Sequence, residues 1–218
     1  TNDVIDFIQI LGDVLDLGVP SDATVTNAKL ASGSFSNITG TGTLTNFTST
    51  GIDDNASANS ITIDSAGHVT KPLQSAVHAY LSTTQSNIST GFTTVNLDAE
   101  IFDVNSDFNT TNYTFTAPVT GKYLATMNLR LNDVDTAFQW IYLVGEASNR
   151  NYYLNVIDPR MLSQDGDWSW VGSSLVDMDA NDTFLMRTRS SSHGAAQMDI
   201  AGGTATSTET TMTMTLLS

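Results

Sequence analysis

The clearest alternation of hydrophobic and polar positions lies between residues 113 and 131. Apolar residues alternate with threonines from Tyr113 to Ala117, which predicts a strand with one buried face. Pro118 to Gly121 has the composition of a tight turn, in which Pro fixes φ and Gly accepts a positive φ. Apolar residues then return at every second position from Tyr123 to Leu131. We therefore expect two strands that form a hairpin in the middle of an antiparallel sheet.

The same pattern, with turn residues about every ten positions, predicts further strands across residues 72–218. This spacing is typical of a β-sandwich or jelly roll. The predicted strands lie near residues 74–82, 93–102, 112–117, 122–131, 137–145, 151–157, 168–177, 182–189, 196–201 and 209–217.

Residues 1–20 have a helical period instead, with Val4, Ile8 and Leu11 spaced by three and four. So short a helix is marginal by itself in water. We expect it to pair with copies of itself or to dock on another protein, and packing on its own domain is the alternative. Gly18 to Pro20 ends it.

Residues 21–71 are repetitive. GSFSNITGT from Gly33 and GTLTNFTST from Gly42 align at a period of nine residues. One such chain cannot bury its apolar stripe, which predicts a thin β shaft built as a solenoid or from three chains around one axis. Within it, ITIDSAGHV predicts a hairpin that turns at Ala66 and Gly67.

Charge and composition exclude several partners. The formal net charge is −15 with only 8 lysines and arginines, which argues against nucleic acid and anionic membranes. Cysteine is absent, so stability must come from packing or oligomerisation. No apolar run is long enough to span a membrane. The start TNDVIDFIQIL carries aspartates where a secretory signal has basic residues, so we expect release from a cell by another route, such as lysis.

Motifs for enzymatic chemistry are missing. The three histidines form no zinc-binding pair, and neither a Gly-x-Ser-x-Gly elbow nor a phosphate loop occurs. The segment DMDAND resembles a calcium loop because its carboxylates alternate, but Asp182 and Thr188 stand where such a loop needs Gly and an acidic residue. An ordinary acidic turn is the alternative. The calcium candidates are Asp177, Asp179, Asn181 and Asp182.

Aromatic and acidic residues give the binding candidates. Trp168 and Trp170 share one face of a predicted strand, with Tyr152 and Tyr153 expected nearby. Sugar stacking is one use of such a face, and packing in the core or between subunits is the other. A pair of carboxylates can also hydrolyse a glycosidic bond, but the spacing singles out no acid and nucleophile. The binding candidates are Tyr152, Tyr153, Asp165, Asp167, Trp168 and Trp170.

The motif Phe115-Thr-Ala-Pro118-x-x-Gly121-x-Tyr123 resembles the hallmark of the jelly-roll family of complement globular heads and tumour-necrosis-factor-like trimers. QSAVHAYL resembles that family's first strand, and LVDMDANDTF resembles its late turn, with Asn181 where the family has Gly. Asn is the next-best residue for a left-handed position. The terminal TMTMTLLS lacks the family's aromatic and glycine. The resemblance covers roughly residues 72–218 and implies a jelly-roll sandwich and a homotrimer.

VTNAKLASGSFSNITG and SITIDSAGHVTKP resemble the shafts of tail fibres of tailed bacteriophages. We therefore expect an all-β homotrimer without cofactors: a helix at 1–20, a thin repetitive β shaft at 21–71, and an antiparallel jelly-roll head at 72–218. The expected function is that of a non-enzymatic virion protein, a tail fibre that adsorbs to the host. Its N-terminal segment would hold another virion protein, and its head would bind a host surface glycan or protein.

We expect the contact surface on loops held by the rigid strands, at 103–111, 146–151, 158–167 and 190–195. Three alternatives stay open. A capsid decoration protein needs the same anchor, stalk and trimer. A polysaccharide-degrading tailspike would use Asp165 or Asp167. A secreted cytokine-like or complement-like ligand has the same head but a different start.

Overall fold

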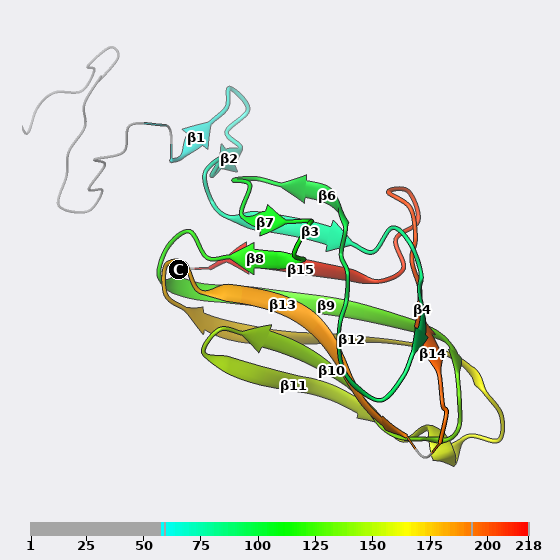
Figure 1. Ribbon diagram of the computed structural model, residues 1–218. Helices are drawn as coiled ribbons and strands as arrows, with labels where there is room; N and C mark the ends of the chain where they lie inside the picture. Colours follow the sequence, from blue (N-terminus) through cyan, green and yellow to red (C-terminus); the bar gives the residue numbers. More distant parts are fainter. Residues whose placement is uncertain (1–57, 59, 193, 218) are drawn as a thin grey trace, which may run out of the picture. The chain divides into compact units, whose positions relative to one another are not determined.

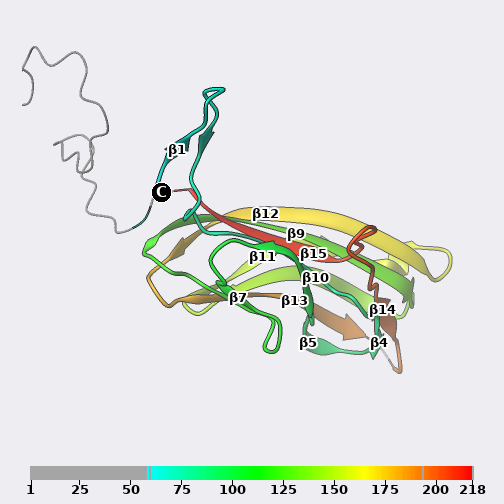
Figure 2. The same ribbon diagram turned by 90° about the horizontal axis from the view of Figure 1, so that it is seen from above.

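The computed structural model describes residues 58, 60–192 and 194–217, and in these residues the regular elements are fifteen strands and one short 3-10 helix, η2 (Pro159–Met161). Most strands form two antiparallel sheets that face each other (Figures 1 and 2). The predicted all-β antiparallel sandwich is therefore confirmed for this part of the chain. The predicted helix at 1–20 and the nine-residue repeats lie outside the described residues.

The six-stranded sheet has the order β11-β10-β13-β8-β7, and β5 also pairs with β13. Every pairing in it is antiparallel. Its strands are β5 (Gly91–Thr94), β7 (Phe108–Asn109), β8 (Thr114–Thr116), β10 (Phe138–Ala147), β11 (Arg150–Ile157) and β13 (Thr183–Ser192).

The seven-stranded sheet has the order β4-β14-β9-β15-β3-β6, and β12 pairs along β9. The central β9 hydrogen-bonds to three strands, and it is the longest in the molecule's described part. The strands are β3 (Ala76–Tyr80), β4 (Gln85–Ile88), β6 (Ala99–Asp103), β9 (Gly121–Val134), β12 (Gly166–Met178), β14 (Met198–Ile200) and β15 (Thr211–Leu216).

A separate hairpin precedes the sandwich. β1 (Thr62–Ile63) pairs with β2 (Val69–Thr70), and Gly67 in the turn has a φ of 87°. The hairpin predicted from ITIDSAGHV is thus confirmed. Positive φ is a conformation that glycine adopts without steric cost, which explains a Gly at this turn.

The predicted hairpin of residues 113–131 is wrong. β8 belongs to the six-stranded sheet and β9 to the seven-stranded one, so Pro118 to Gly121 crosses between sheets. Among the described glycines, positive φ occurs at Gly67, Gly91 and Gly194, and Gly121 is not one of them. Alternation identifies which face of a strand is buried, but it does not identify the neighbouring strand. Two successive strands can bury their apolar faces in the same core whether they lie in one sheet or in two opposite sheets.

Aromatic packing explains the crossover. The Phe115 ring of β8 meets the Tyr123 ring of β9 edge to face, with centroids 5.5 Å apart, and both residues are fully buried. The Tyr123 hydroxyl donates to the Val119 carbonyl at 2.7 Å, which satisfies a polar group that burial would otherwise leave unpaired. Phe115 and Tyr123 thus pack together at the crossover, and the role of Pro118 and Gly121 in the same motif stays a prediction.

Other strand predictions are largely confirmed, with two differences. The stretch 93–102 is two strands, β5 and β6, which lie in different sheets. Val95 and Leu97 between them are fully buried and therefore extend the apolar pattern without a strand. The short β4 and β7 were not predicted, because QSNI and FN are too short and too polar to show a period.

The core lies between the two sheets. Every second residue of β9 from Tyr123 to Leu131 is fully buried there, as the alternation predicts. It meets residues of the other sheet such as Leu143 and Phe184, which belong to the same hydrophobic cluster. Because side chains alternate across a strand, this core also fixes which residues lie on the two outer faces of the sandwich.

Candidate interaction surfaces

The outer face of the seven-stranded sheet carries rows of uncharged residues. One row runs from Leu175 of β12 over Leu124 and Thr215 to Ala76 of β3. The next runs from Ser173 over Thr126, Thr213 and His78 to Phe102 of β6. We call this surface the threonine face. Its residues are Ala76, His78, Phe102, Val104, Leu124, Thr126, Val171, Ser173, Leu175, Thr213 and Thr215.

Large apolar side chains of the threonine face are open to solvent. Leu175 is 62% exposed, Val171 59% and Phe102 47%. The His78 ring contacts Phe102 edge to face at 5.9 Å, and partial burial lowers the pKa of His78, which favours its neutral form. The face thus offers apolar and uncharged area that nothing in the described chain covers.

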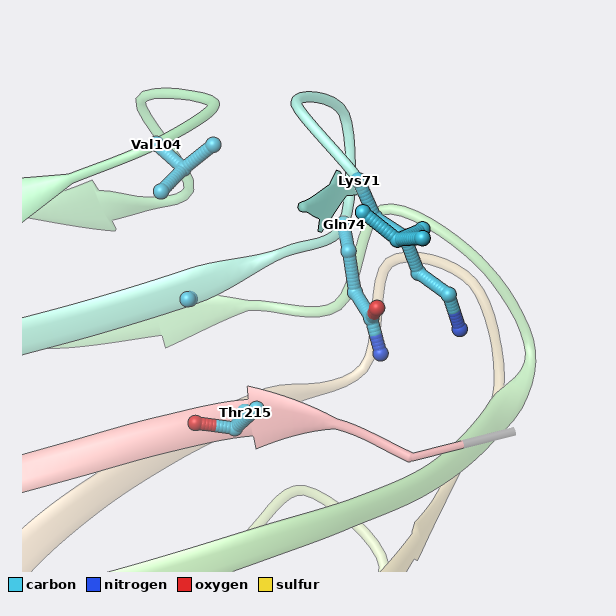
Figure 3. Close-up of a pocket in the computed structure, with 6 residues that line it drawn as sticks. Lys71, Gln74, Val104 and Thr215 are labelled. Carbon is cyan, nitrogen blue, oxygen red and sulfur yellow. The ribbon is translucent and has the colours of Figure 1, made fainter. Parts of the chain in front are cut away.

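The apolar surface continues onto the β1–β2 hairpin. Ile61, Ile63 and Val69 are 54%, 68% and 60% exposed. A hollow of about 440 Å³ lies where the hairpin meets the sheet, beside the edge of the threonine face (Figure 3). Its lining residues are Val69, Lys71, Gln74, Ala76, Val104 and Thr215.

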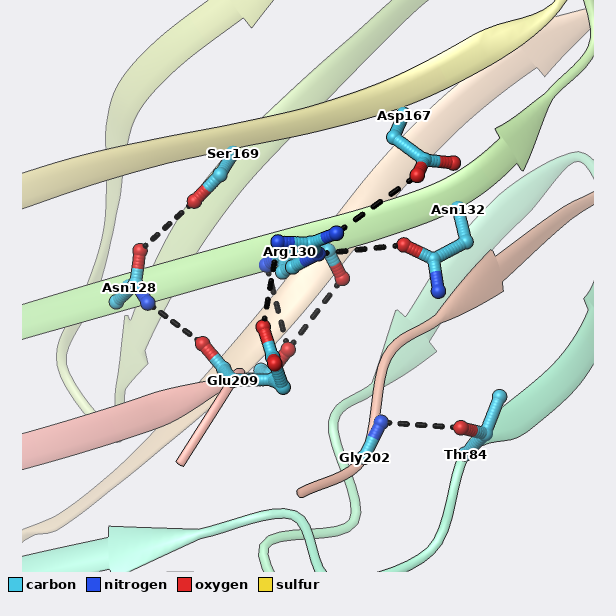
Figure 4. Close-up of polar contacts among 9 residues, drawn as sticks. Thr84, Asn128, Arg130, Asn132, Asp167, Ser169, Gly202 and Glu209 are labelled. Carbon is cyan, nitrogen blue, oxygen red and sulfur yellow. Dashed lines mark hydrogen bonds and ion pairs between the residues drawn. The ribbon is translucent and has the colours of Figure 1, made fainter. Parts of the chain in front are cut away.

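The other end of the same sheet surface is polar, and its arginine is paired with carboxylates. The Arg130 guanidinium lies 3.7 Å from Asp167 and 3.4 Å from Glu209, and its Nε donates to Asn132 at 3.3 Å (Figure 4). Asn128 donates to the Glu209 carbonyl at 2.6 Å. Exposed ion pairs of this kind contribute little stability, and the two carboxylates more than balance the charge of Arg130.

The outer face of the six-stranded sheet has a different composition. One row across it runs from Phe92 of β5 over Arg189 of β13 and Tyr142 of β10 to Val156 of β11. The next row places Arg187 beside Val144 and Tyr153. We call this surface the aromatic-arginine face. Its residues are Phe92, Trp140, Tyr142, Tyr153, Arg187 and Arg189.

Arg189 is the centre of the aromatic-arginine face. Its guanidinium carbon lies 4.9 Å from the ring centroid of Phe92, 5.3 Å from that of Trp140 and 5.9 Å from that of Tyr153. Its Nη1 also donates to the Tyr153 hydroxyl at 3.0 Å. Distances of this size are those of cation–π contacts, which hold the arginine in place by the electron-rich faces of the rings.

The aromatic rings also support one another. Tyr142 meets Trp140 edge to face at 5.1 Å and Tyr153 at 5.4 Å. Phe92 is 41% and Tyr153 45% exposed, although both are large apolar rings. The result is an aromatic surface with rings from three strands, β5, β10 and β11, and with its edge open to solvent.

The two arginines of this face differ in their partners. Arg187 donates to Glu146 at 2.5 Å and also lies over Phe92 at 4.8 Å. Arg189 has no ion pair with a carboxylate among residues 58, 60–192 and 194–217. The face therefore carries an excess positive charge in a chain whose formal charge is −15.

The structure separates the aromatic residues that the sequence grouped together. Tyr153 lies on the aromatic-arginine face, whereas Tyr152 points inward and packs against the core, with its ring 6.4 Å from that of Phe184. Trp168 and Trp170 share one face of β12, as predicted, and that face packs against the core. This placement favours packing over sugar stacking for the two tryptophans.

The acidic candidates bind backbone amides near the end of β9. The Asp165 carboxylate accepts from the Thr136 amide at 2.9 Å, and that of Asp167 accepts from the Asp133 amide at 3.3 Å. Both therefore order the turns beside the end of β9. Their assignment to a binding site stays a prediction.

The proposed calcium turn satisfies its carboxylates internally. Asp182 accepts from the Ser148 hydroxyl at 2.6 Å and from the Asp179 amide at 2.9 Å, and these hydrogen bonds lower the pKa of Asp182. Asp177 pairs with Lys122, and Asn181 has a φ of 73°, the left-handed conformation expected for it. Within the described residues, no group of three or more histidines or carboxylates is arranged to hold a metal ion.

Sequence reasoning missed Phe92, Trp140, Arg187 and Arg189. They come from three strands that are far apart in the sequence and adjacent only in the sheet. Alternation within AFQWIYLVG could have placed Trp140 and Tyr142 on one face. No sequence signal could have placed Phe92 beside the arginines.

Comparisons with known proteins yield only distant structural likeness. No family model matches the sequence, and no curated protein matches it. Among solved structures, the globular domain of the zebrafish complement 1qA protein superposes with a TM-score of 0.47 at 13% identity, covering 66% of this chain and 98% of that chain. Murine APRIL, solved at pH 8.5, gives 0.46 at 13% identity, with coverage of 66% and 99%.

The Eiger TNF protein from S. frugiperda gives a TM-score of 0.45 at 10% identity, and covers 66% of this chain and 93% of that one. These values describe a coarse likeness in the course of the chain, and no function follows from them. A search of the described residues finds no helix that is long and apolar enough to cross a membrane.

Proposed function

We propose that this chain is a non-enzymatic, homotrimeric structural protein of a tailed-phage virion, whose head domain mediates adsorption to the host surface. The single observation that carries the trimer is the threonine face. Its aliphatic and aromatic side chains are about half exposed, and its two central rows contain no charged residue.

A second copy of the same chain is the occupant that fits this face. Contiguous apolar patches of this kind are typical of protein contacts, because covering them removes apolar area from water. The surface continues over the hollow at Lys71 onto Ile61 and Ile63 of the hairpin. Another copy of the chain presents the same uncharged sheet and hairpin, and a ring of copies can cover these surfaces without burying an unpaired charge.

The sequence supports both the number of copies, three, and the location in a virion. The repeats from Gly33 resemble tail-fibre shafts, in which three chains around one axis bury each other's apolar stripe. Three heads held together bind a surface more tightly than one, because each bound head raises the effective concentration of the others. This gives adhesion without an enzymatic site.

Sedimentation equilibrium of the purified full-length chain at micromolar concentration tests the assembly. We expect a mass three times that of the 23.3 kDa chain. A monomer mass would overturn the trimer.

Immunogold electron microscopy of virions, with antibody to residues 72–218, tests the place of action. Gold at the tail is the expected outcome. Gold spread over the capsid would show a decoration protein instead. Particles without any gold would contradict the proposal that the protein is part of the virion.

A further inference from the structure

We propose that the aromatic-arginine face binds an acidic sugar, with the Arg189 guanidinium paired to its carboxylate and the sugar ring stacked on the neighbouring aromatic side chains. The inference deepens the proposed adhesive function, on which it rests for its biological role. It moves the expected contact from the loops to the open surface of a sheet.

The first argument is the charge of Arg189. The chain has 23 acidic residues and only 8 lysines and arginines. Arg130, Arg160 and Arg187 each pair with a carboxylate, whereas Arg189 and the exposed Arg150 have no such ion pair within the described residues. Arg189 differs from Arg150 because aromatic rings surround its guanidinium. Of the five N–H donors of Arg189, the described contacts use one, to Tyr153. The others remain for a carboxylate, which a guanidinium can bind with two parallel hydrogen bonds.

The second argument is that the guanidinium is already held in place. Three rings surround it at 4.9–5.9 Å, and the side chains come from strands of one sheet. Little rotamer freedom is left to lose when a ligand binds, and sites on strands are positioned more precisely than sites on loops. The arrangement is therefore preorganised for an anion.

The third argument is the exposure of the rings. Phe92 and Tyr153 keep 41% and 45% of their area exposed, so part of each ring stays open to a ligand beside the cation. The apolar C–H face of a pyranose can cover such a ring, while its hydroxyl groups stay in water. Tyr153 also presents a hydroxyl group at the same place.

Other ligand classes fit less well. Nucleic acid is disfavoured because a net charge of −15 repels a phosphate backbone. A neutral sugar would leave the charge of Arg189 unused. A protein partner would more readily take the threonine face, which is uncharged and continues over the hairpin.

The test is a calorimetric titration of the purified full-length chain with trigalacturonate and with its methyl ester. The two probes share rings and linkages and differ in charge. Millimolar to submillimolar binding of the acid is expected, at least about tenfold tighter than that of the ester, since one charged hydrogen bond contributes about 1.5–3 kcal/mol. A trimer of mannuronate serves as a second acidic probe.

Arg189→Gln should reduce binding of the acid to the level of the ester. Arg150→Gln is the matched control, because it removes the same charge from the exposed end of the neighbouring β10–β11 hairpin. Trp140→Leu, which keeps the charge and removes a ring, should weaken both probes alike. Equal melting temperatures show that each variant is folded.

Absence of binding to both acidic probes at millimolar concentration would overturn the inference. So would equal affinity for acid and ester, or an equal loss in the Arg189 and Arg150 variants. These results are separate from those of the proposed function. If the chain is a monomer and binds trigalacturonate, the proposed trimer is wrong and the proposed sugar site stands. If the chain is a trimer on the virion and binds neither acidic probe, the proposed function stands and the sugar site is wrong.

Discussion

The two outer faces of the sandwich are built on the same backbone geometry and differ in chemistry. The threonine face offers β-branched and aliphatic side chains over an area without charge, and its charged groups, around Arg130, are paired among themselves. The aromatic-arginine face offers rings and an arginine without a carboxylate partner in the described chain. Covering the threonine face removes mainly apolar area from water, which is favourable. Covering the aromatic-arginine face would also bury the charge of Arg189, which is costly unless an anion pairs with it.

Under the proposed function, the two outer faces of one sandwich make two different contacts. A copy of the same chain fits the uncharged surface, because contact between identical charged patches would place like charges together. A ligand of opposite charge fits the other. The shared core lies between the two faces and supports both. A change on one face should therefore affect the other face only by changing the stability of the whole sandwich.

The largest effect is expected from Phe102→Asp on the threonine face. A carboxylate placed in an apolar interface is desolvated without a partner, so we expect the trimer to dissociate, with at least about a hundredfold loss in the association constant. Sedimentation equilibrium measures it. Val156→Asp is the matched control on the opposite sheet, since Phe102 and Val156 are 47% and 53% exposed. A trimer in the Phe102 variant would place the interface elsewhere.

Gly145→Ala tests the core that connects the two faces. A Cβ at this position of β10 would overlap the Phe184 ring and stand 3.0 Å from Met127 Cε. Overpacking of this kind costs about 1–3 kcal/mol of unfolding free energy. Thermal unfolding should show a lower melting temperature, with trimer mass and sugar binding both retained below it. Gly166→Ala, which has nothing within 4 Å of its added Cβ, should leave the melting temperature unchanged.

Acidification should weaken the trimer through His78. Partial burial in the single chain already lowers the pKa of His78 below its ordinary 6.5. In the proposed trimer the covered threonine face would bury His78 further, so the dissociated chain would bind the proton more readily than the trimer. The stabilisation of the trimer is thus expected above the pKa of the dissociated chain, and is lost as the pH falls through that value. Phe102 and Thr213, which face His78, carry no charge.

Sedimentation at pH 7.5 and pH 5.5 measures this change. His78→Gln, which cannot titrate, should remove the pH dependence over this window. If the His78 variant still dissociates more at pH 5.5 than at pH 7.5, another titrating group causes the pH dependence. Sugar binding at the opposite face should vary little between the two pH values.

The smallest effect is expected from Tyr153→Phe. It keeps the ring beside Arg189 and removes the hydroxyl that accepts from Nη1 at 3.0 Å. We expect a loss in trigalacturonate affinity of a few-fold, consistent with about 1 kcal/mol for one hydrogen bond. Tyr152→Phe is the control, because the Tyr152 ring packs against the core and lies outside the aromatic-arginine face, and it should bind as the wild type does. An equal loss in the Tyr152 variant would show that the hydroxyl of Tyr153 does not act at the site.

Much of the strand content follows from the sequence because alternation is a local property. Tyr123 to Leu131 predicts β9 with its buried face, and Ala66 and Gly67 predict the turn of the β1–β2 hairpin. The partners of each strand do not follow in the same way. β8 and β9 are adjacent in sequence and lie in different sheets, since burying one face does not specify which strand lies beside it.

The candidate site shows the same limit. The sequence identified Tyr153 as an aromatic candidate, and grouped it with Trp168 and Trp170, which pack against the core. Phe92 and Arg189 are separated by almost a hundred residues and meet because β5 pairs with β13. Neither residue has a neighbour in the sequence that marks its role.

The β-rich class, the negative charge, the left-handed Asn181 and the alternating face of each long strand could all be predicted from the amino-acid sequence. These features depend on side-chain volume, charge and backbone preference, which act over a few residues. The crossing of β8 and β9 between sheets, and the contrast between an uncharged outer face and one that surrounds Arg189 with rings, became visible only in the folded chain. Pairing between distant strands brings together residues that no local pattern connects.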